Sequence, residues 1–339
     1  ALHYPLGNYN IPYLYFLCLF SYSSINDLYL IKLLSIFFDV LLAYGAMMLL
    51  GKVRESIPAR IACFFTVLFL PTVILNGSLW AQCDSIYVAL AVLAIYFALD
   101  DRPILSVLFF TLSFGFKLQA VFLLPVMAVL WLKGKYKLWH FLLFPVFYVL
   151  LVLPAVALGK PFLETLTLYA SQTGSIGDGL NYNSPSVYAF FQYDPSVTDL
   201  AAASRMGIIA AFVFMCVILA VCAIKRRSIT NGVIVAVSVL FAVGIPFLLP
   251  HMHDRYFFAA DVLTVVMAYA YVKYAAAAPL TQFASLLGYH AYLKMRYLLL
   301  MDHGARALIV ALMLGIVLFA QLLSANGDTG AAGMHTDAE

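Results

Sequence analysis

The segment His251–Phe257, with the sequence HMHDRYF, places two imidazoles, a carboxylate and a guanidinium between two long apolar runs. Imidazole and guanidinium groups donate hydrogen bonds to anions such as phosphates. Charged groups at the edge of a membrane-spanning run either face water or bind a ligand. The segment is therefore either a hydrated turn between two helices or part of an anion-binding site.

Lys117 is the second candidate for anion chemistry, because it interrupts the apolar stretch Phe114–Gln119. A lysine at the centre of a span costs about 2.5 to 3.5 kcal/mol in membrane insertion. Its ammonium either reaches the interface or pairs with a buried anion. The neighbouring Gln119 favours the buried anion, and Arg255 could bind the same anion through its planar fork. The predicted phosphate-binding residues are Lys117, His251, His253 and Arg255.

Other polar residues leave alternatives open. Asp84 precedes an apolar run, so it is either an N-cap or part of the site. Asp39 lies inside a predicted span, where pairing with a lysine of the bundle would compensate its charge. His251 and His253 project differently, so one of them could face a ligand while the other caps a helix. The spacing supplies no third metal ligand, so it does not support a divalent metal or any other firm cofactor.

The composition identifies the class of protein that must position these groups. Of 339 residues, 65% are hydrophobic and 10% are charged, and the net charge is +3; the mean hydropathy is +0.98. Soluble domains carry about 25% charged residues. The sequence therefore predicts an all-α, multi-pass integral membrane protein. Its basic residues form short clusters without interleaved aromatic residues, which excludes nucleic acid as a partner.

Apolar runs define the expected spans. They are Leu28–Leu50, Ile61–Leu75, Ile86–Leu99, Trp139–Leu158, Ala203–Ile224, Val233–Leu249, Phe257–Val272 and Arg306–Leu323. The stretch Pro103–Lys133 is too short for two full spans, which need about 40 residues. We expect two short helices there that meet partway through the membrane at Lys117 and Gln119. Residues 1–323 are predicted to form a single transmembrane domain, followed by a disordered polar tail at 324–339.

The placement of lysine and arginine predicts the orientation. Lys52–Arg60, Lys133–Lys137 and Lys225–Arg227 are expected on the cytoplasmic side. Residues 275–303 are predicted to be a partly amphipathic cytoplasmic segment. Residues 1–26 are expected to contain an amphipathic helix at the outer interface, and 159–199 to form an outer loop. The turn from Trp80 to Ser85, Ser175 and the His251–Phe257 segment then share the non-cytoplasmic face.

Three motifs carry a resemblance to a known family. They are Leu79-Trp80-Ala81-Gln82-Cys83-Asp84-Ser85-Ile86-Tyr87, Phe114-Gly115-Phe116-Lys117-Leu118-Gln119 and Met252-His253-Asp254-Arg255-Tyr256-Phe257. Together they resemble the GT-C superfamily of membrane glycosyltransferases, especially the bacterial branch related to the GPI-anchor mannosyltransferase. The His251–Arg255 segment also resembles the His-x-His-Glu-Lys motif of the dolichyl-phosphate-glucose glucosyltransferases. Asn8–Tyr13 resembles the Asp-Tyr-Pro-Pro stretch of their first outer loop. The likeness covers most of residues 1–270.

The resemblance implies a GT-C-like helical bundle with short broken helices near the active site. It implies an inverting transfer of a hexose, with mannose or glucose favoured, from a polyprenyl-phosphate-sugar donor. The acceptor would be a lipid-linked or cell-surface glycan at the non-cytoplasmic face of the cell membrane, or of an endomembrane in a eukaryote. The family's general-base carboxylate is expected upstream of Ala1. The substrate-binding or supporting residues would be Trp80, Gln82, Asp84, Gln119, Asp254, Tyr9, Asn10 and Asn183.

Two other classes of protein remain as alternatives. A transporter or flippase of lipid-linked sugars would also use an intramembrane lysine and an outer vestibule. Many transporter folds contain two related halves, and the sequence shows no internal repeat. A structural membrane subunit is the third class, and it leaves Lys117 and the His251–Phe257 segment without a role.

Overall fold

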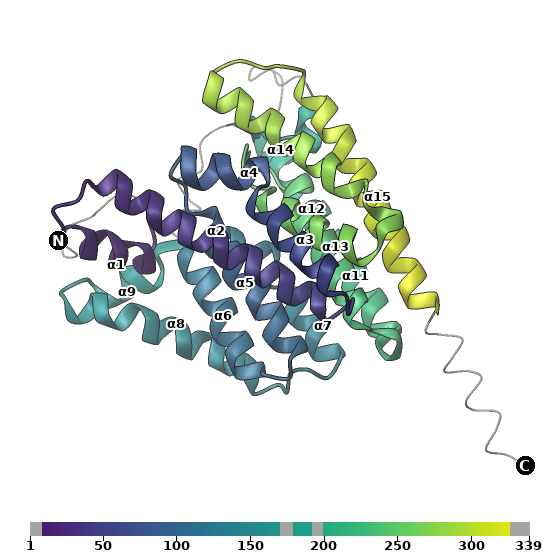
Figure 1. Ribbon diagram of the computed structural model, residues 1–339, viewed down its shortest axis with the longest axis horizontal. Helices are drawn as coiled ribbons and strands as arrows, with labels where there is room; N and C mark the ends of the chain where they lie inside the picture. Colours follow the sequence, from purple (N-terminus) through teal and green to yellow (C-terminus); the bar gives the residue numbers. More distant parts are fainter. Residues whose placement is uncertain (1–8, 170–178, 192–198, 326–339) are drawn as a thin grey trace, which may run out of the picture. The chain divides into compact units, whose positions relative to one another are not determined.

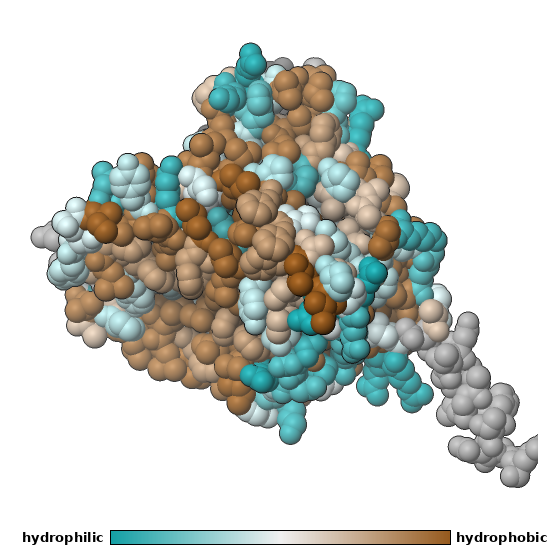
Figure 2. Space-filling view, viewed as in Figure 1, coloured by the Kyte–Doolittle hydropathy of each residue, from teal (hydrophilic) through white to brown (hydrophobic). Residues whose placement is uncertain are grey.

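The structure is a computed structural model that describes residues 9–169, 179–191 and 199–325 (Figure 1). Within these residues the chain forms 14 α-helices and one pair of short strands. Five helices are long and apolar enough to cross a membrane, and a bent helix pair brings the number to six. Apolar side chains form broad areas of the surface in Figure 2. The protein is therefore a multi-pass helical membrane protein.

The elements follow one another closely along the chain. The first half contains α1 (Ile11–Phe20), α2 (Asp27–Gly51), α3 (Ile57–Leu68), α4 (Pro71–Ile74), η1 (Leu75–Leu79), α5 (Asp84–Leu99), α6 (Pro103–Phe116), η2 (Leu118–Phe122), α7 (Val126–Leu132), α8 (His140–Ala157) and α9 (Phe162–Leu166). The second half contains β1 (Asn181–Tyr182), η3 (Val187–Phe190), α11 (Leu200–Ile224), η4 (Arg226–Ser228), α12 (Asn231–Leu248), β2 (Met252–His253), α13 (Phe258–Ala270), η5 (Val272–Tyr274), α14 (Ala277–Lys294) and α15 (Met301–Ala325).

The chain divides into two compact units. Unit 1 comprises Ala1–Leu49, Phe64–Val121 and Lys137–Asp178, and unit 2 comprises Leu50–Cys63, Phe122–Tyr136 and Gly179–Glu339. In unit 1, α5 packs along α6, and α6 packs along α8. In unit 2, α12 packs against α7, α11, α13 and α15. The helices α5 and α12 are buried over nearly their whole length, because a helix that is apolar on every side is stable in the interior of a bundle.

Most of the predicted long spans are confirmed. The helices α2, α8, α11, α12 and α15 coincide with predicted runs and are candidate membrane spans. The predicted span Ile61–Leu75 corresponds to a bent pair of helices and not to one straight helix. Pro71 begins a new helix within it, and the pair Ile57–Leu68 and Pro71–Leu79 is bent by 42°. A proline lacks the N–H that would continue the helical ladder, which explains the break.

The helix predicted in residues 1–26 exists as α1, but it is not amphipathic. Its sequence IPYLYFLCLF is apolar around the whole helix, and Ile11 to Leu14 are buried. The hydroxyl of Tyr15 donates to the carbonyl of Leu151 at 2.8 Å and accepts from the N–H of Ala155 at 3.1 Å. This hydroxyl therefore enters the hydrogen-bond ladder of α8 beside Pro154, and α1 is fixed to α8 within unit 1.

Basic segments from separate parts of the chain meet at one end of unit 2. Arg54 donates to the carbonyl of Tyr269 at 2.7 Å, and Lys133 donates to that of Ile229 at 2.8 Å. Asn231 donates to the carbonyl of Lys52 at 2.8 Å. The predicted grouping of these basic segments on one side is consistent with this arrangement. We call this region, with Lys52, Arg54, Lys133, Lys225, Arg226, Arg227 and Lys273, the basic end.

The placement of residues 275–303 needs a correction. The Tyr297 hydroxyl donates to Asn183 Oδ1 at 2.6 Å, so this segment reaches the end of unit 2 that carries part of the 159–199 loop. The two segments cannot lie on opposite sides as predicted. The polar residues of α14 that looked amphipathic bond to α13 instead of facing water. Thr281 pairs with Thr264 at 2.9 Å, and Ser285 donates to Asp261 at 3.0 Å.

Candidate functional site

Lys117 lies where α6 ends, as the sequence predicted. The helix stops at Phe116, and Lys117 has an extended backbone with φ −154° and ψ 132°. A helix end leaves carbonyl groups without helical partners. Asn10 donates to the carbonyl of Gly115 at 2.5 Å, and Tyr169 donates to that of Phe114 at 2.7 Å. Burial raises the pKa of Tyr169 above its usual value, which keeps this hydroxyl protonated.

The ammonium of Lys117 donates to Asp84 Oδ1. Asn76 holds the same carboxylate by donating to Oδ2 at 2.7 Å and by accepting from the Asp84 backbone N–H at 3.3 Å. The side chain of Asp84 is 1% exposed and that of Lys117 is 15% exposed. The N-cap interpretation of Asp84 is wrong, because Asp84 is the first residue of α5 and its carboxylate binds other side chains.

Asp39 forms the other half of this buried network. It is 4% exposed and accepts a hydrogen bond from the hydroxyl of Ser85, not from the lysine that we expected. A Cβ atom added to Gly77 would lie 2.5 Å from Asp39 Oδ2, so the carboxylate packs directly on the backbone of the π-helix η1. Such π-helical turns occur often at functional sites. We call Asp39, Asn76, Asp84, Ser85 and Lys117 the Lys117 cluster.

The other predicted residues of unit 1 differ in how deeply they are buried and in what they contact. Gln119 is in η2, and its Oε1 atom is buried without a hydrogen-bond partner among the described residues. Gln82 is half-buried, and its carbonyl accepts from Ser35 at 2.9 Å. Trp80 is half-buried directly after η1. Tyr9 is exposed, with its ring centroid 4.7 Å from that of Tyr13.

The ring of His251 is held within unit 2 by both of its nitrogens. Its Nδ1 donates to the carbonyl of Gly179 at 2.7 Å, and its Nε2 pairs with the hydroxyl of Ser204 at 3.1 Å. Both ring nitrogens therefore bond within unit 2. With φ at +61°, His251 also makes the left-handed turn that leads into β2. It fixes the start of this turn and the loop before β1.

Three other predicted residues, His253, Asp254 and Arg255, lie in β2 or directly after it. His253 pairs in register with Tyr182, and their rings stack at 4.7 Å with an angle of 14°. Arg255 Nη1 lies 3.7 Å from Asp254 Oδ1, and the Asp254 side chain is buried. Asn183 follows β1 at φ +56° and accepts from Tyr297. We call residues 251–257 the His251 turn.

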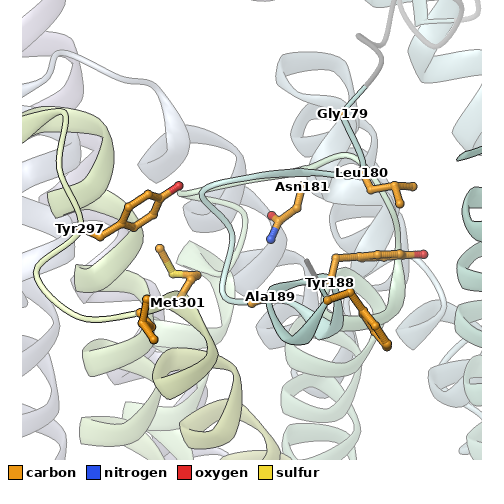
Figure 3. Close-up of a pocket in the computed structure, with 9 residues that line it drawn as sticks. Gly179, Leu180, Asn181, Tyr188, Ala189, Tyr297 and Met301 are labelled. Atoms are coloured by element: carbon orange, nitrogen blue, oxygen red, sulfur yellow. The ribbon is translucent and has the colours of Figure 1, made fainter. Parts of the chain in front are cut away.

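A pocket of about 260 Å³ lies next to this loop in unit 2. Figure 3 shows Tyr297 and Met301 on one side, Leu180 and Tyr188 on the other, and Asn181 between them. None of the nine described residues that line it is charged. The polar ones already have partners: Asn181 with the backbone of Ser184, Tyr188 with the carbonyl of Ala203, and Tyr297 with Asn183. The pocket therefore suits an apolar group.

The sequence interpretation missed two buried polar residues. Asn76 precedes the turn from Trp80 to Ser85, and only the packing of η1 against α5 shows that it binds Asp84. Asp261 lies fully buried in α13, where it accepts from Ser285. An aspartate inside an apolar run is rare and usually has a functional or structural partner, so the sequence alone could have marked Asp261 as a candidate. The prediction that Lys117 and Arg255 bind one phosphate stays a prediction.

Comparisons with known proteins assign neither a family nor a function to the chain. No known family model matches the chain, and no curated protein is significantly similar to it. Across residues 9–169, 179–191 and 199–325, no group of three or more His, Cys, Asp or Glu side chains is arranged to hold a metal ion.

Proposed function

We propose that the protein is a membrane glycosyltransferase that moves a hexose from a polyprenyl-phosphate-sugar donor to a lipid-linked or cell-surface glycan. The observation that carries the proposal is the Lys117 cluster, a buried ion pair placed where a helix is interrupted. A structural bundle gains little from such a pair, because desolvating the two charges offsets most of their attraction. Ionisable groups inside a membrane protein usually serve function. The motif resemblance supplies the reaction.

The chemistry follows from the charge of the donor. Cleavage of a glycosyl phosphate leaves an anion, and a fixed cation stabilises the charge that develops on it. The ammonium of Lys117 carries three donor positions, so a phosphate oxygen can bind it while Asp84 keeps its orientation. The buried Gln119 Oε1 can accept a hydrogen bond from a sugar hydroxyl. The acceptor hydroxyl needs a carboxylate base, which the resemblance locates before the tyrosine-rich segment.

Unit 2 offers separate contacts. In the His251 turn, His253 and Arg255 can donate hydrogen bonds or carry positive charge. We include them among the residues that contact the polyprenyl-phosphate-sugar donor. His251 is a positioning residue in this proposal, because its two nitrogens are bonded to Gly179 and Ser204. The neutral pocket beside Tyr188 and Tyr297 suits part of a hydrocarbon chain, since its polar groups are already bonded.

A transporter of lipid-linked sugars is the second candidate. The bent pair Ile57–Leu68 and Pro71–Leu79 favours it, because interrupted helices with polar residues often form transport sites. The two functions differ in the fate of the donor. A transferase cleaves the sugar–phosphate bond, whereas a transporter moves the intact lipid across the bilayer.

The test uses purified protein in proteoliposomes with radiolabelled polyprenyl-phosphate mannose or glucose and a glycolipid extract as acceptor. The proposal predicts that label moves to the acceptor in the wild type. Replacing Lys117 alone would leave Asp84 buried without its cation, so the informative variant is Lys117→Met with Asp84→Asn, which removes both charges. It should fold and lose roughly 100-fold or more in transfer rate. Intact donor on the opposite leaflet, without loss of sugar, would establish transport instead.

A further inference from the structure

The basic end of unit 2 carries an excess of positive charge. Its segments bring Lys52, Arg54, Lys133, Arg226 and Arg227 together, because the side chains of Arg54, Lys133 and Asn231 donate to backbone carbonyls of neighbouring segments. In the same segments, 50–57, 130–136, 224–231 and 270–275, the only acidic residue is Glu55. Cytoplasmic loops are commonly basic, so this excess by itself indicates orientation and does not define a site.

The surface also contains a hollow that the orientation rule does not require. A depression of about 350 Å³ is lined by residues 223–228, including Lys225, Arg226 and Arg227. These three side chains are exposed, and Arg226 and Arg227 belong to the short helix η4. Three cations around one concave surface can contact several oxygens of one phosphate group.

An apolar residue borders the cations at the end of a candidate membrane span. Ile224 is the last residue of the candidate span α11 and is 79% exposed. The hollow thus combines a hydrocarbon contact with a cationic rim, in the order in which a phospholipid presents its acyl chain and its phosphate. An anionic headgroup is favoured over a zwitterionic one, because basic residues near a membrane surface attract negatively charged lipids.

We propose that the hollow at residues 223–228 binds an anionic phospholipid, with Lys225, Arg226 and Arg227 on the headgroup and Ile224 against the acyl chain. The inference does not depend on the glycosyltransferase proposal. It assigns the same site to a transporter or a transferase.

The experiment measures lipid retention by native mass spectrometry of the full chain released from nanodiscs that contain phosphatidylglycerol and phosphatidylcholine. The test variant is Arg226→Gln with Arg227→Gln. The control is Lys294→Gln with Arg296→Gln, which removes the same charge in the segment that leads to Tyr297. The test pair should bind phosphatidylglycerol roughly tenfold or more weakly than wild type, and the control pair should bind it like wild type. Equal melting temperatures in phosphatidylcholine nanodiscs would establish that the variants fold.

Three outcomes would overturn the proposal. One is unchanged retention in the test pair, and another is an equal loss in the control pair, which would reflect general surface charge. The third is displacement of phosphatidylglycerol by millimolar inorganic phosphate, which would indicate a site for free anions. A further variant, Ile224→Asn, should weaken binding of phosphatidylglycerol and leave binding of soluble glycerophosphate unchanged. Equal effects on both would remove the acyl chain from the proposal.

Discussion

The Lys117 cluster of unit 1 and the His251 turn of unit 2 hold their charged groups in opposite ways. In the cluster, carboxylates and an ammonium are bonded to one another through side chains and are almost wholly buried. In the turn, the backbone, a stacked ring and the buried Asp254 beside Arg255 hold the functional groups, and His253 and Arg255 are only half-buried. A buried charge depends on its partner for stability, whereas a half-buried one keeps part of its hydration. The difference predicts that stability and activity separate in unit 2 and are coupled in unit 1.

The largest expected effect comes from breaking the Lys117–Asp84 pair. Lys117→Met or Asp84→Asn alone leaves one charge buried without its partner and should lower the free energy of unfolding by roughly 3 to 5 kcal/mol. The double variant removes both charges and should recover most of this loss. Thermal and denaturant unfolding in one detergent would measure the cycle.

Additive effects in that cycle would contradict the coupling. Arg102→Gln is a matched control, because Arg102 pairs with Asp100 at 3.1 Å while its side chain is 61% exposed. Surface pairs of this kind contribute little, so the control should melt close to wild type.

Gly77→Ala should produce the next largest loss. The added Cβ would lie 2.5 Å from Asp39 Oδ2, which forces the buried carboxylate away from Ser85. Overpacking of this kind costs about 1 to 3 kcal/mol. Gly45→Ala is the control, since its Cβ would meet the flexible side chain of Leu93 at 3.2 Å. If Gly77→Ala and Gly45→Ala melt at the same temperature, the close contact between Gly77 and Asp39 does not contribute to stability as we expect.

The two regions also differ in how far the sequence could predict them. Apolar run length was enough for α2, α8, α11, α12 and α15, and the short stretch 103–133 predicted the break at Lys117. The Lys117–Asp84 contact joins residues 33 positions apart and depends on how α5 packs along α6. Sequence spacing does not contain that information.

The errors have a common physical cause. Asp39 was expected to pair with a lysine, and the polar residues of α14 were expected to face water. Inside a bundle such groups bond to the nearest helix instead, as Ser85 bonds Asp39 and Ser285 bonds Asp261. His251 and His253 were expected to project differently, and they do: the His251 ring bonds to Gly179 at a positive φ, whereas the His253 ring stacks on Tyr182.

In the His251 turn, the two histidines should give opposite results. His251→Ala removes both bonds of its ring and should cost about 1 to 2 kcal/mol, with His251→Asn less damaging because asparagine tolerates positive φ. His253→Ala loses the stacking on Tyr182 but should above all lose donor affinity, and His253→Asn should keep more of that affinity because it can still donate. Melting temperature and donor-lipid binding, measured on the same samples, separate the two roles. If His251→Ala alone loses affinity and His253→Ala alone loses stability, the roles are reversed.

The smallest predicted effect compares how much one tyrosine hydroxyl contributes to stability in unit 1 and how much another contributes in unit 2. Tyr15→Phe removes the hydroxyl that bridges Leu151 and Ala155 of α8, and it leaves the N–H of Ala155 without that acceptor. Tyr297→Phe removes a hydroxyl that donates to the exposed side of Asn183, which water can replace. The first change should cost about 1 kcal/mol and the second less, because a lost bond matters most where water cannot take its place. Tyr22→Phe, at a side chain that is 86% exposed, should be neutral. Unfolding by denaturant at constant detergent would rank the three variants. If Tyr15→Phe and Tyr297→Phe lost the same free energy of unfolding, the half-buried loop would depend on its hydroxyl as much as the hydrogen-bond ladder of α8 does.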